Sequence, residues 1–171
     1  YNYKPYATIQ GGHSNYIYGY SGTIGGGMSN SEYGSHGSVG GGWYNACFSS
    51  YTSVGGGRYD RVYSYMGRIG GGGYNNVYGY QDSIGGGSYN YAYYYYSGVG
   101  GGHNNYVAGY GSTISGGTYV SVYGLWSTVA GGHDVHVSGV SSTVGGGQFQ
   151  HVYRPLSTIG GGDSNYIYGY G

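Results

Sequence analysis

Tyrosine offers the most chemistry in this sequence, because it recurs at a spacing of 15 residues. The chain of 171 residues contains 29 tyrosines. One series at this spacing comprises Tyr18, Tyr33, Tyr63, Tyr78, Tyr93, Tyr123, Tyr153 and Tyr168. A phenol joins a flat apolar ring to a hydroxyl that donates and accepts hydrogen bonds, which suits contacts with carbohydrates and proteins. The series predicts an outward stripe for adhesion or self-assembly. Rings that stack only to stabilise the fold are the alternative.

The other reactive residue types form no recognisable catalytic pattern. His136 and His151 lie one spacing apart with His133 nearby, and stacked imidazoles could hold a metal ion. We interpret them instead as exposed residues at variable positions. The glycine triplets are not phosphate loops, since neither a Lys-Ser/Thr pair nor a helical pattern follows them. Cys47 stands in an apolar column and is interpreted as a core residue. We therefore predict no enzymatic activity, no cofactor and no metal site.

The spacing of the tyrosines belongs to a repeat that runs through the chain without insertion or deletion. Numbering starts at the first residue of each glycine triplet, so position 1 begins each repeat. One continuous array results, with a partial coil at 1–9, ten 15-residue coils at 10–159 and a partial coil at 160–171. Positions 2 and 3 are glycine in every copy. From Ile17 on, position 8 is apolar in ten of eleven copies, with Glu32 as the exception. Position 15 is always Ile or Val, and forms a predicted core ladder of Ile24, Val39, Val54, Ile69, Ile84, Val99, Ile114, Val129, Val144 and Ile159.

Each repeat contains two five-residue stretches that alternate with a period of two, as in 105–109 and 112–116. Such alternation predicts short strands, and the glycine and small polar residues between them predict turns. A helix is excluded, because glycine costs about 1 kcal/mol per helical position relative to alanine. The sequence therefore predicts an all-β fold, a single-chain β-solenoid or parallel β-roll with two short strands per coil. Stacked coils also place an Asn column at position 6, where each amide can bond its neighbours in the stack.

Alternation predicts which positions face inward. Positions 13, 15 and 2 of one strand and positions 6, 8 and 10 of the other are expected inside, and the tyrosines of position 9 outside. Position 14, mostly Thr or Ser, and position 1, mostly Gly, form a flat outer face suited to packing against another protomer. Two aliphatic side chains per coil make a thin core, so we expect self-association to supply further burial.

Half-repeats such as Ser142-Thr143-Val144-Gly145-Gly146 and Asn105-Tyr106-Val107-Ala108-Gly109 resemble the head repeats of trimeric autotransporter adhesins, the YadA-like heads. Similar repeats occur in phage tail and fibre proteins. The resemblance covers essentially the whole chain. It implies a left-handed parallel β-roll, a homotrimer, and a place outside the cell or at its surface. Tyrosine stands here where those heads favour alanine and short polar residues.

Composition argues against two classes of function, nucleic-acid binding and membrane spanning. Charged residues make up 6% of the chain and the formal net charge is zero, which argues against nucleic-acid binding. No apolar run approaches the roughly 18 residues of a membrane span. One coil contains four charged residues, which are expected to form solvated pairs: Arg58, Asp60, Arg61 and Arg68.

The leading prediction is a structural rod of an extracellular fibre or adhesin that associates as a homotrimer or an end-to-end filament. A solenoid that binds glycan, a host-surface protein or ice, and a phage tail-fibre segment, are the alternatives.

Overall fold

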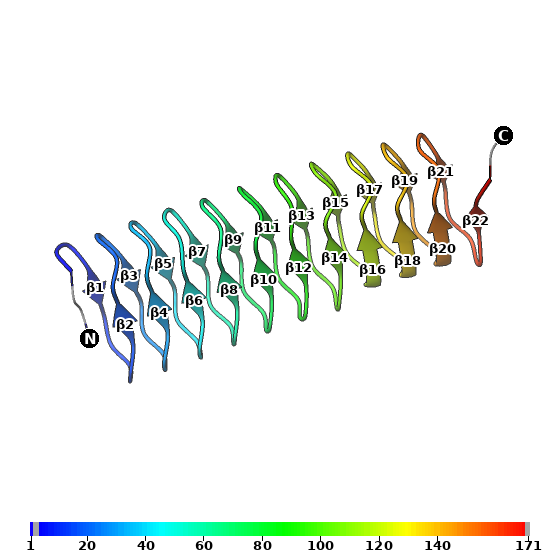
Figure 1. Cartoon of the computed structure of the whole chain (residues 1–171). Helices are drawn as coiled ribbons and strands as arrows, with labels where there is room; N and C mark the ends of the chain where they lie inside the picture. The colour runs from blue at the N-terminus through cyan, green and yellow to red at the C-terminus, as the bar shows by residue number, and fades with distance from the viewer. Residues whose placement is uncertain (2–3, 170–171) are drawn as a thin grey trace.

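The computed structural model describes residue 1 and residues 4–169, and shows one rod of stacked coils (Figure 1). Residues 2–3 and 170–171, which the repeat assigns to the two partial coils, lie outside the described part. The predicted fold class is confirmed. Every described strand is parallel to its neighbours, each coil contributes one strand to each of two sheets, and no helix occurs among the described residues. Each register pairs a residue with the one 15 positions later, as for Thr113 and Thr128.

One sheet of 11 strands is formed by positions 14 and 15 of each coil. Its strands are β1 (Thr8–Ile9), β3 (Thr23–Ile24), β5 (Ser38–Val39), β7 (Ser53–Val54), β9 (Arg68–Ile69), β11 (Ser83–Ile84), β13 (Gly98–Val99), β15 (Thr113–Ile114), β17 (Thr128–Val129), β19 (Thr143–Val144) and β21 (Thr158–Ile159).

The second sheet also has 11 strands and is centred on positions 7 and 8. Its strands are β2 (Tyr16–Ile17), β4 (Ser31–Glu32), β6 (Ala46–Cys47), β8 (Arg61–Val62), β10 (Asn76–Val77), β12 (Tyr91–Ala92), β14 (Tyr106–Val107), β16 (Thr118–Val122), β18 (His133–Val137), β20 (Gln148–Val152) and β22 (Tyr166–Ile167). The three five-residue strands are those whose position 6 is not Asn or Asp. There the backbone ladder extends through position 6, as in the pairing of Val120 with Val135.

The core lies between the two sheets and consists of the columns at positions 8 and 15. All ten predicted ladder residues of position 15 are buried, with 6% exposure at most. From Ile17 to Val152, position 8 faces them with fully buried aliphatic side chains, Cys47 and the carboxyl side chain of Glu32, and Ile167 beyond is partly buried. The alternation of the strands therefore predicts the hydrophobic interior correctly at these two columns.

Two polar columns complete the interior. At position 6 each Asn carbonyl oxygen accepts from the backbone N–H of the next coil, as between Asn45 N and Asn30 Oδ1 (3.0 Å). The amide of Asn30 donates to the carbonyl oxygens of Gly26 (2.9 Å) and Gly42 (2.8 Å). At position 13 Ser127 N donates to Ser112 Oγ (2.9 Å), and that hydroxyl donates onward to Gly124 O. Each column thus links consecutive coils through side chains as well as backbone, as predicted for Asn.

The prediction that position 2 faces inward is wrong. A methyl group added to Gly11, Gly56 or Gly101 would meet nothing within 4 Å. The neighbouring position 3 is the constrained one. Gly102 has a φ of +95°, and a methyl group there would overlap the carbonyl oxygen of Gly117 in the next coil. The glycines of positions 2 and 3 therefore belong to the turn beyond the strand.

Each coil turns at positions 5 and 12, where non-glycine residues adopt left-handed backbone angles. Tyr74 has a φ of +60° and Tyr96 a φ of +60°. Their amides donate backwards along the rod, as from Tyr96 N to Tyr80 O (3.0 Å). Strand amides donate in both directions, forwards from Gly98 N to Ser112 O (3.0 Å) and backwards from Ile17 N to Tyr1 O (2.9 Å). Bulky side chains disfavour this conformation, so the surrounding stack must hold it in place. Sequence reasoning placed tyrosines of positions 5 and 11 at the turns but did not predict the left-handed backbone angles at positions 5 and 12.

Candidate functional site

The predicted tyrosine stripe is a stack of rings on the outer face of the second sheet. Ring centroids lie 4.9 Å apart between Tyr18 and Tyr33, and 4.7 Å apart between Tyr63 and Tyr78. The planes of these two pairs differ by 2° and 5°. Phe48 fills the intermediate place, 5.1 Å from Tyr33 and 4.7 Å from Tyr63. The structure places all eight predicted residues on the surface: Tyr18, Tyr33, Tyr63, Tyr78, Tyr93, Tyr123, Tyr153 and Tyr168.

The stack continues through the two described coils that lack an aromatic residue at position 9. At Ala108 the ring of Tyr106, from position 7, lies 6.1 Å from Tyr93 and 5.5 Å from Tyr123. At the next gap His136 lies 5.3 Å from Tyr123 and 5.4 Å from Tyr153. The row of rings from Tyr18 to Tyr168 is therefore unbroken, although the column at position 9 is not.

A second stack runs along the corner at position 5. Tyr44, Tyr59, Tyr74 and Tyr89 follow one another at 4.9–5.0 Å. Beyond them position 5 is Asn104 and later Asp134, and histidines of position 4 replace the missing rings. His103 lies between Tyr89 (5.6 Å) and Tyr119 (6.0 Å), and His133 between Tyr119 (5.9 Å) and Phe149 (6.1 Å). Sequence reasoning missed these bridging rings, although the signal was present: the gaps at Asn104 and Asp134 each coincide with a histidine in the adjacent column.

The opposite corner carries shorter groups of rings from positions 11 and 12. Tyr65 and Tyr80 stack at 5.8 Å, and Tyr80 meets Tyr96 edge to face at 5.7 Å. Tyr110 then contacts Trp126 at 5.0 Å. Aromatic rings thus follow three lines along the rod, at position 9, at position 5 and at positions 11 and 12.

Burial and neighbouring rings shift the pKa of several side chains in the outer stack. Burial raises the pKa of Tyr78, and the neighbouring phenols Tyr63, Tyr91 and Tyr93 raise it further. Burial likewise raises the pKa of Tyr106. The pKa of His136 is lowered, mainly by burial and additionally by the neighbouring His151. These shifts favour the neutral forms of Tyr78, Tyr106 and His136.

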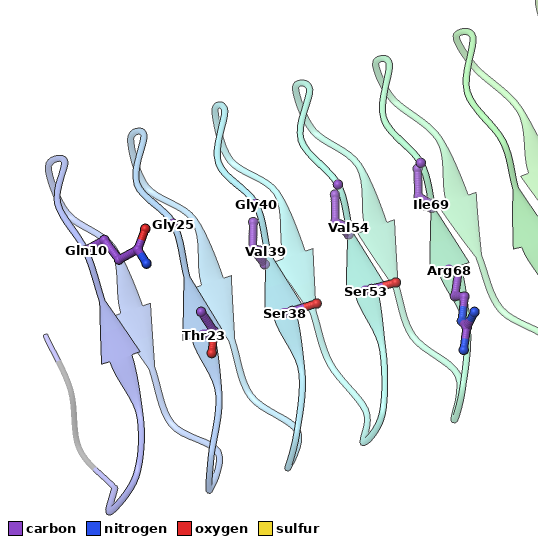
Figure 2. A pocket seen from close by; sticks show the side chains of 12 residues that line it. Gln10, Thr23, Gly25, Ser38, Val39, Gly40, Ser53, Val54, Arg68 and Ile69 are labelled. Atoms are coloured by element: carbon purple, nitrogen blue, oxygen red, sulfur yellow. The ribbon is translucent and has the colours of Figure 1, made fainter.

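The flat outer face of the first sheet lies on the other side of the rod. Its position 14 side chains are mostly exposed hydroxyls. A shallow groove of about 560 Å³ runs along it, and Figure 2 shows Thr23, Ser38, Ser53 and Arg68 on successive coils of this face. The guanidinium of Arg68 and the missing side chain of Gly98 interrupt the hydroxyl column.

Three carboxyl groups lie inside the rod. Glu32, Asp60 and Asp82 are fully buried, and at least one oxygen of each has no hydrogen-bond partner. Burial raises the pKa of Glu32 to about 7, with the amides of Gly19 and Gly34 opposing the shift. Burial also raises the pKa of Asp60 to about 6 and that of Asp82 to about 7. These carboxyls are therefore largely or partly protonated near neutral pH.

The expectation that Asp60 forms solvated pairs with its neighbouring arginines is wrong. Its carboxyl points inward in the Asn column, where Asn75 N donates to Oδ1 (2.8 Å). Burial of the carboxyls also changes the surface charge. Up to residue 129, every exposed charged side chain of the described chain is a cation: Lys4, Arg58, Arg61 and Arg68. The described surface up to residue 129 is therefore cationic, although the formal net charge of the sequence is zero.

The remaining candidate residues have no arrangement typical of an active site. Cys47 is buried in the position 8 column, and burial raises the pKa of its thiol to about 11. His136 and His151 stack at 6.1 Å within the ring row. In the part of the chain that the structure describes, no three His, Cys, Asp or Glu residues gather as metal ligands, and no helix is long and apolar enough to cross a membrane.

Comparison with known proteins did not assign the chain to a family. No protein-family model matches the chain, and no curated protein matches it.

Proposed function

We propose that this chain is a non-enzymatic structural rod of an extracellular fibre or adhesin, and that its rows of rings serve adhesion or self-assembly. The observation that carries the proposal is the unbroken row of rings from Tyr18 to Tyr168. A contiguous aromatic surface of this kind on a protein usually meets a partner. The resemblance to the heads of trimeric adhesins supports a location outside the cell or at its surface.

Self-association through the flat face follows from the thin core. Each coil orders 15 residues around two aliphatic side chains. Burial of an aliphatic side chain contributes about 1.5–3 kcal/mol, whereas ordering costs about 1–2 kcal/mol per residue. The flat face can approach a second copy closely because its side chains are short, and three copies around a common axis would leave the ring rows outside.

The first test is the size of the particle. We expect a trimer in solution at micromolar concentration, measured by light scattering and sedimentation velocity. Replacing Thr128 on the flat face by Trp should dissociate it, because the indole prevents close approach of two copies. Tyr78→Ser, on the opposite face, is the matched control and should leave the particle size unchanged. A monodisperse monomer for the unmodified chain would contradict the trimer.

A second candidate function is carbohydrate recognition by the ring row. It is supported by the exposed phenols of the row. Their ring faces are covered by neighbours in the stack, but their ring edges and hydroxyls remain exposed and can contact sugar hydroxyls. A glycan array probed with the soluble protein tests it. We expect Tyr78→Ser to weaken any binding at least fivefold and Tyr78→Phe to weaken it less, with unchanged far-UV spectra. Equal loss in both variants would show that the ring is not the contact. The threonine column is too interrupted to favour ice binding.

A further inference from the structure

A groove on the corner of positions 3 to 5 has the form of a ligand site. It has a volume of about 700 Å³ and is lined by Trp43, Gly57, Arg58, Gly72, Gly73, Tyr74, Gly87, Ser88 and Tyr89. Position 4 carries a side chain in the flanking coils, and Gly73 leaves a gap between Arg58 and Ser88. The groove therefore exists because one side chain of a continuous column is missing.

The walls of the groove are stacked aromatic rings. Tyr74 and Tyr89 stack at 4.9 Å with parallel planes, and they belong to the corner stack that starts at Tyr44. The floor is the backbone of position 3, where Gly57, Gly72 and Gly87 have φ angles of +100°, +109° and +83°. Such a surface needs little reorganisation to receive a ligand, which favours binding.

One cation stands in the groove. The guanidinium of Arg58 lies over the ring of Tyr74, 5.5 Å from its centroid. It has no carboxylate partner within the described chain, because the acidic residue of its own coil, Asp60, is buried on the other side of the backbone. A guanidinium presents several N–H donors in a fixed fork that matches an anionic group, and an unpaired one beside a groove is ready to bind it.

The geometry points to an acidic saccharide as the ligand of this groove. From Trp43 to Ser88 the groove extends over three coil spacings, about 14 Å at about 4.8 Å per coil, so a short chain of sugar rings could lie along the rod. We propose that Arg58 binds the carboxylate or sulfate of one sugar, that the exposed ring of Trp43 contacts a sugar face, and that Ser88 and the phenol groups of Tyr74 and Tyr89 bond hydroxyls. A single guanidinium does not suit a nucleic acid, whose phosphates need repeated cations.

This inference does not depend on the proposed function. The groove lies at the corner stack, whereas the trimer uses the flat face and the second candidate function uses the position 9 row. Either can fail while the other holds.

The fluorescence of Trp43 provides the test. Trp126 is the other tryptophan of the chain, so Trp126→Phe leaves Trp43 as the only indole reporter. In that background the protein is titrated with a galacturonic acid trisaccharide, a sulfated trisaccharide and the methyl ester of the first. We expect a saturable change with at least one charged probe and none with the ester. Arg58→Ala should weaken binding at least tenfold, and Arg58→Lys less.

Two further variants separate the groove from general charge attraction. Arg68→Ala removes the same charge from the same coil but from the flat face, and should change affinity less than twofold. Gly73→Trp fills the groove and should abolish binding. It should not disturb the fold, because Gly73 has no left-handed φ, a Cβ there meets only Arg58 O at 3.5 Å, and position 4 already carries Trp43. Equal losses for Arg58→Ala and Arg68→Ala, binding of the ester, or no saturable signal from either charged probe would overturn the proposal.

Discussion

Replacing Gly102 by Ala should unfold the central coils, whereas the same replacement at Gly101 should be tolerated. At Gly102 an added methyl group overlaps the carbonyl oxygen of Gly117, which is fixed in the backbone of the next coil, and the φ of +95° disfavours any side chain. Strain and overlap together should cost about 3 kcal/mol or more. At Gly101 nothing lies within 4 Å of the added methyl group, so the expected change is within about 0.5 kcal/mol.

Thermal unfolding followed by far-UV circular dichroism measures both effects, and limited proteolysis locates the opened coils. Because neighbouring coils support one another in a solenoid, damage at Gly102 should appear first in the adjacent repeats. The two glycines are adjacent and both invariant among the repeats, so the pair is its own control. Similar midpoints for the two variants would contradict the stacking contact between positions 3 of successive coils.

The second large effect concerns the buried carboxyl of Asp60. Asparagine at this place in the column donates from its amide to two carbonyl oxygens, as Asn75 does to Gly71 O (3.1 Å) and Gly87 O (3.0 Å). Asp60 can donate only when protonated, and its buried Oδ2 has no partner. We expect Asp60→Asn to raise the free energy of unfolding by about 3 kcal/mol at pH 8, since the pKa of Asp60 rises from 3.8 to about 6 on folding.

The same groups make the stability of the native chain depend on pH. The pKa values of Glu32, Asp60 and Asp82 are about 7, 6 and 7 in the fold, against ordinary values of 4.5, 3.8 and 3.8. The folded state therefore binds more protons than the unfolded state between pH 4 and 7. Their contribution to stability is fully present below the ordinary values and is lost as the pH rises through the folded values. His136 has the opposite effect on stability: below pH 6.5 its contribution increases as the pH rises, because burial favours its neutral form.

Urea unfolding at pH 5, 6, 7 and 8 measures this dependence. We expect the midpoint to fall from pH 5 to pH 8 in the native chain and to fall less in Asp60→Asn. Asp163→Asn changes the charge by the same amount at an exposed site, and should leave the profile unchanged. A midpoint that rises across this interval would mean that the three carboxyls are not buried in the folded protein.

Much of this fold could be predicted from the sequence, because the repeat is strict. A column such as Val107 and Val122 recurs with the same neighbours in every coil, so alternation alone assigns it to the interior. The prediction fails where the chain leaves the strands. Gly101 and Gly102 look alike in the sequence, and only the left-handed backbone of the second separates them.

The candidate site was predictable only in part, for a related reason. The ring row was expected from position 9, but the bridges by Tyr106 and His136 depend on side chains leaning across to an adjacent column. The groove beside Arg58 depends on the absence of a side chain at Gly73, which a search for functional residues does not reveal. Asp60 was expected in solvated pairs although it occupies position 6 of the Asn column, and only its burial decides between the two.

The direction of the hydrogen bonds has a mechanical consequence. Bonds such as Gly98 N to Ser112 O and Tyr91 N to Asn105 O join consecutive coils, so they lie along the rod, and the two ends of the array are at opposite ends of it (Figure 1). Tension between the ends would load the bonds of a terminal coil first and peel coils away one at a time. Each released coil of 15 residues would lengthen from about 4.8 Å to about 50 Å, a tenfold extension that absorbs work while the remaining coils stay folded.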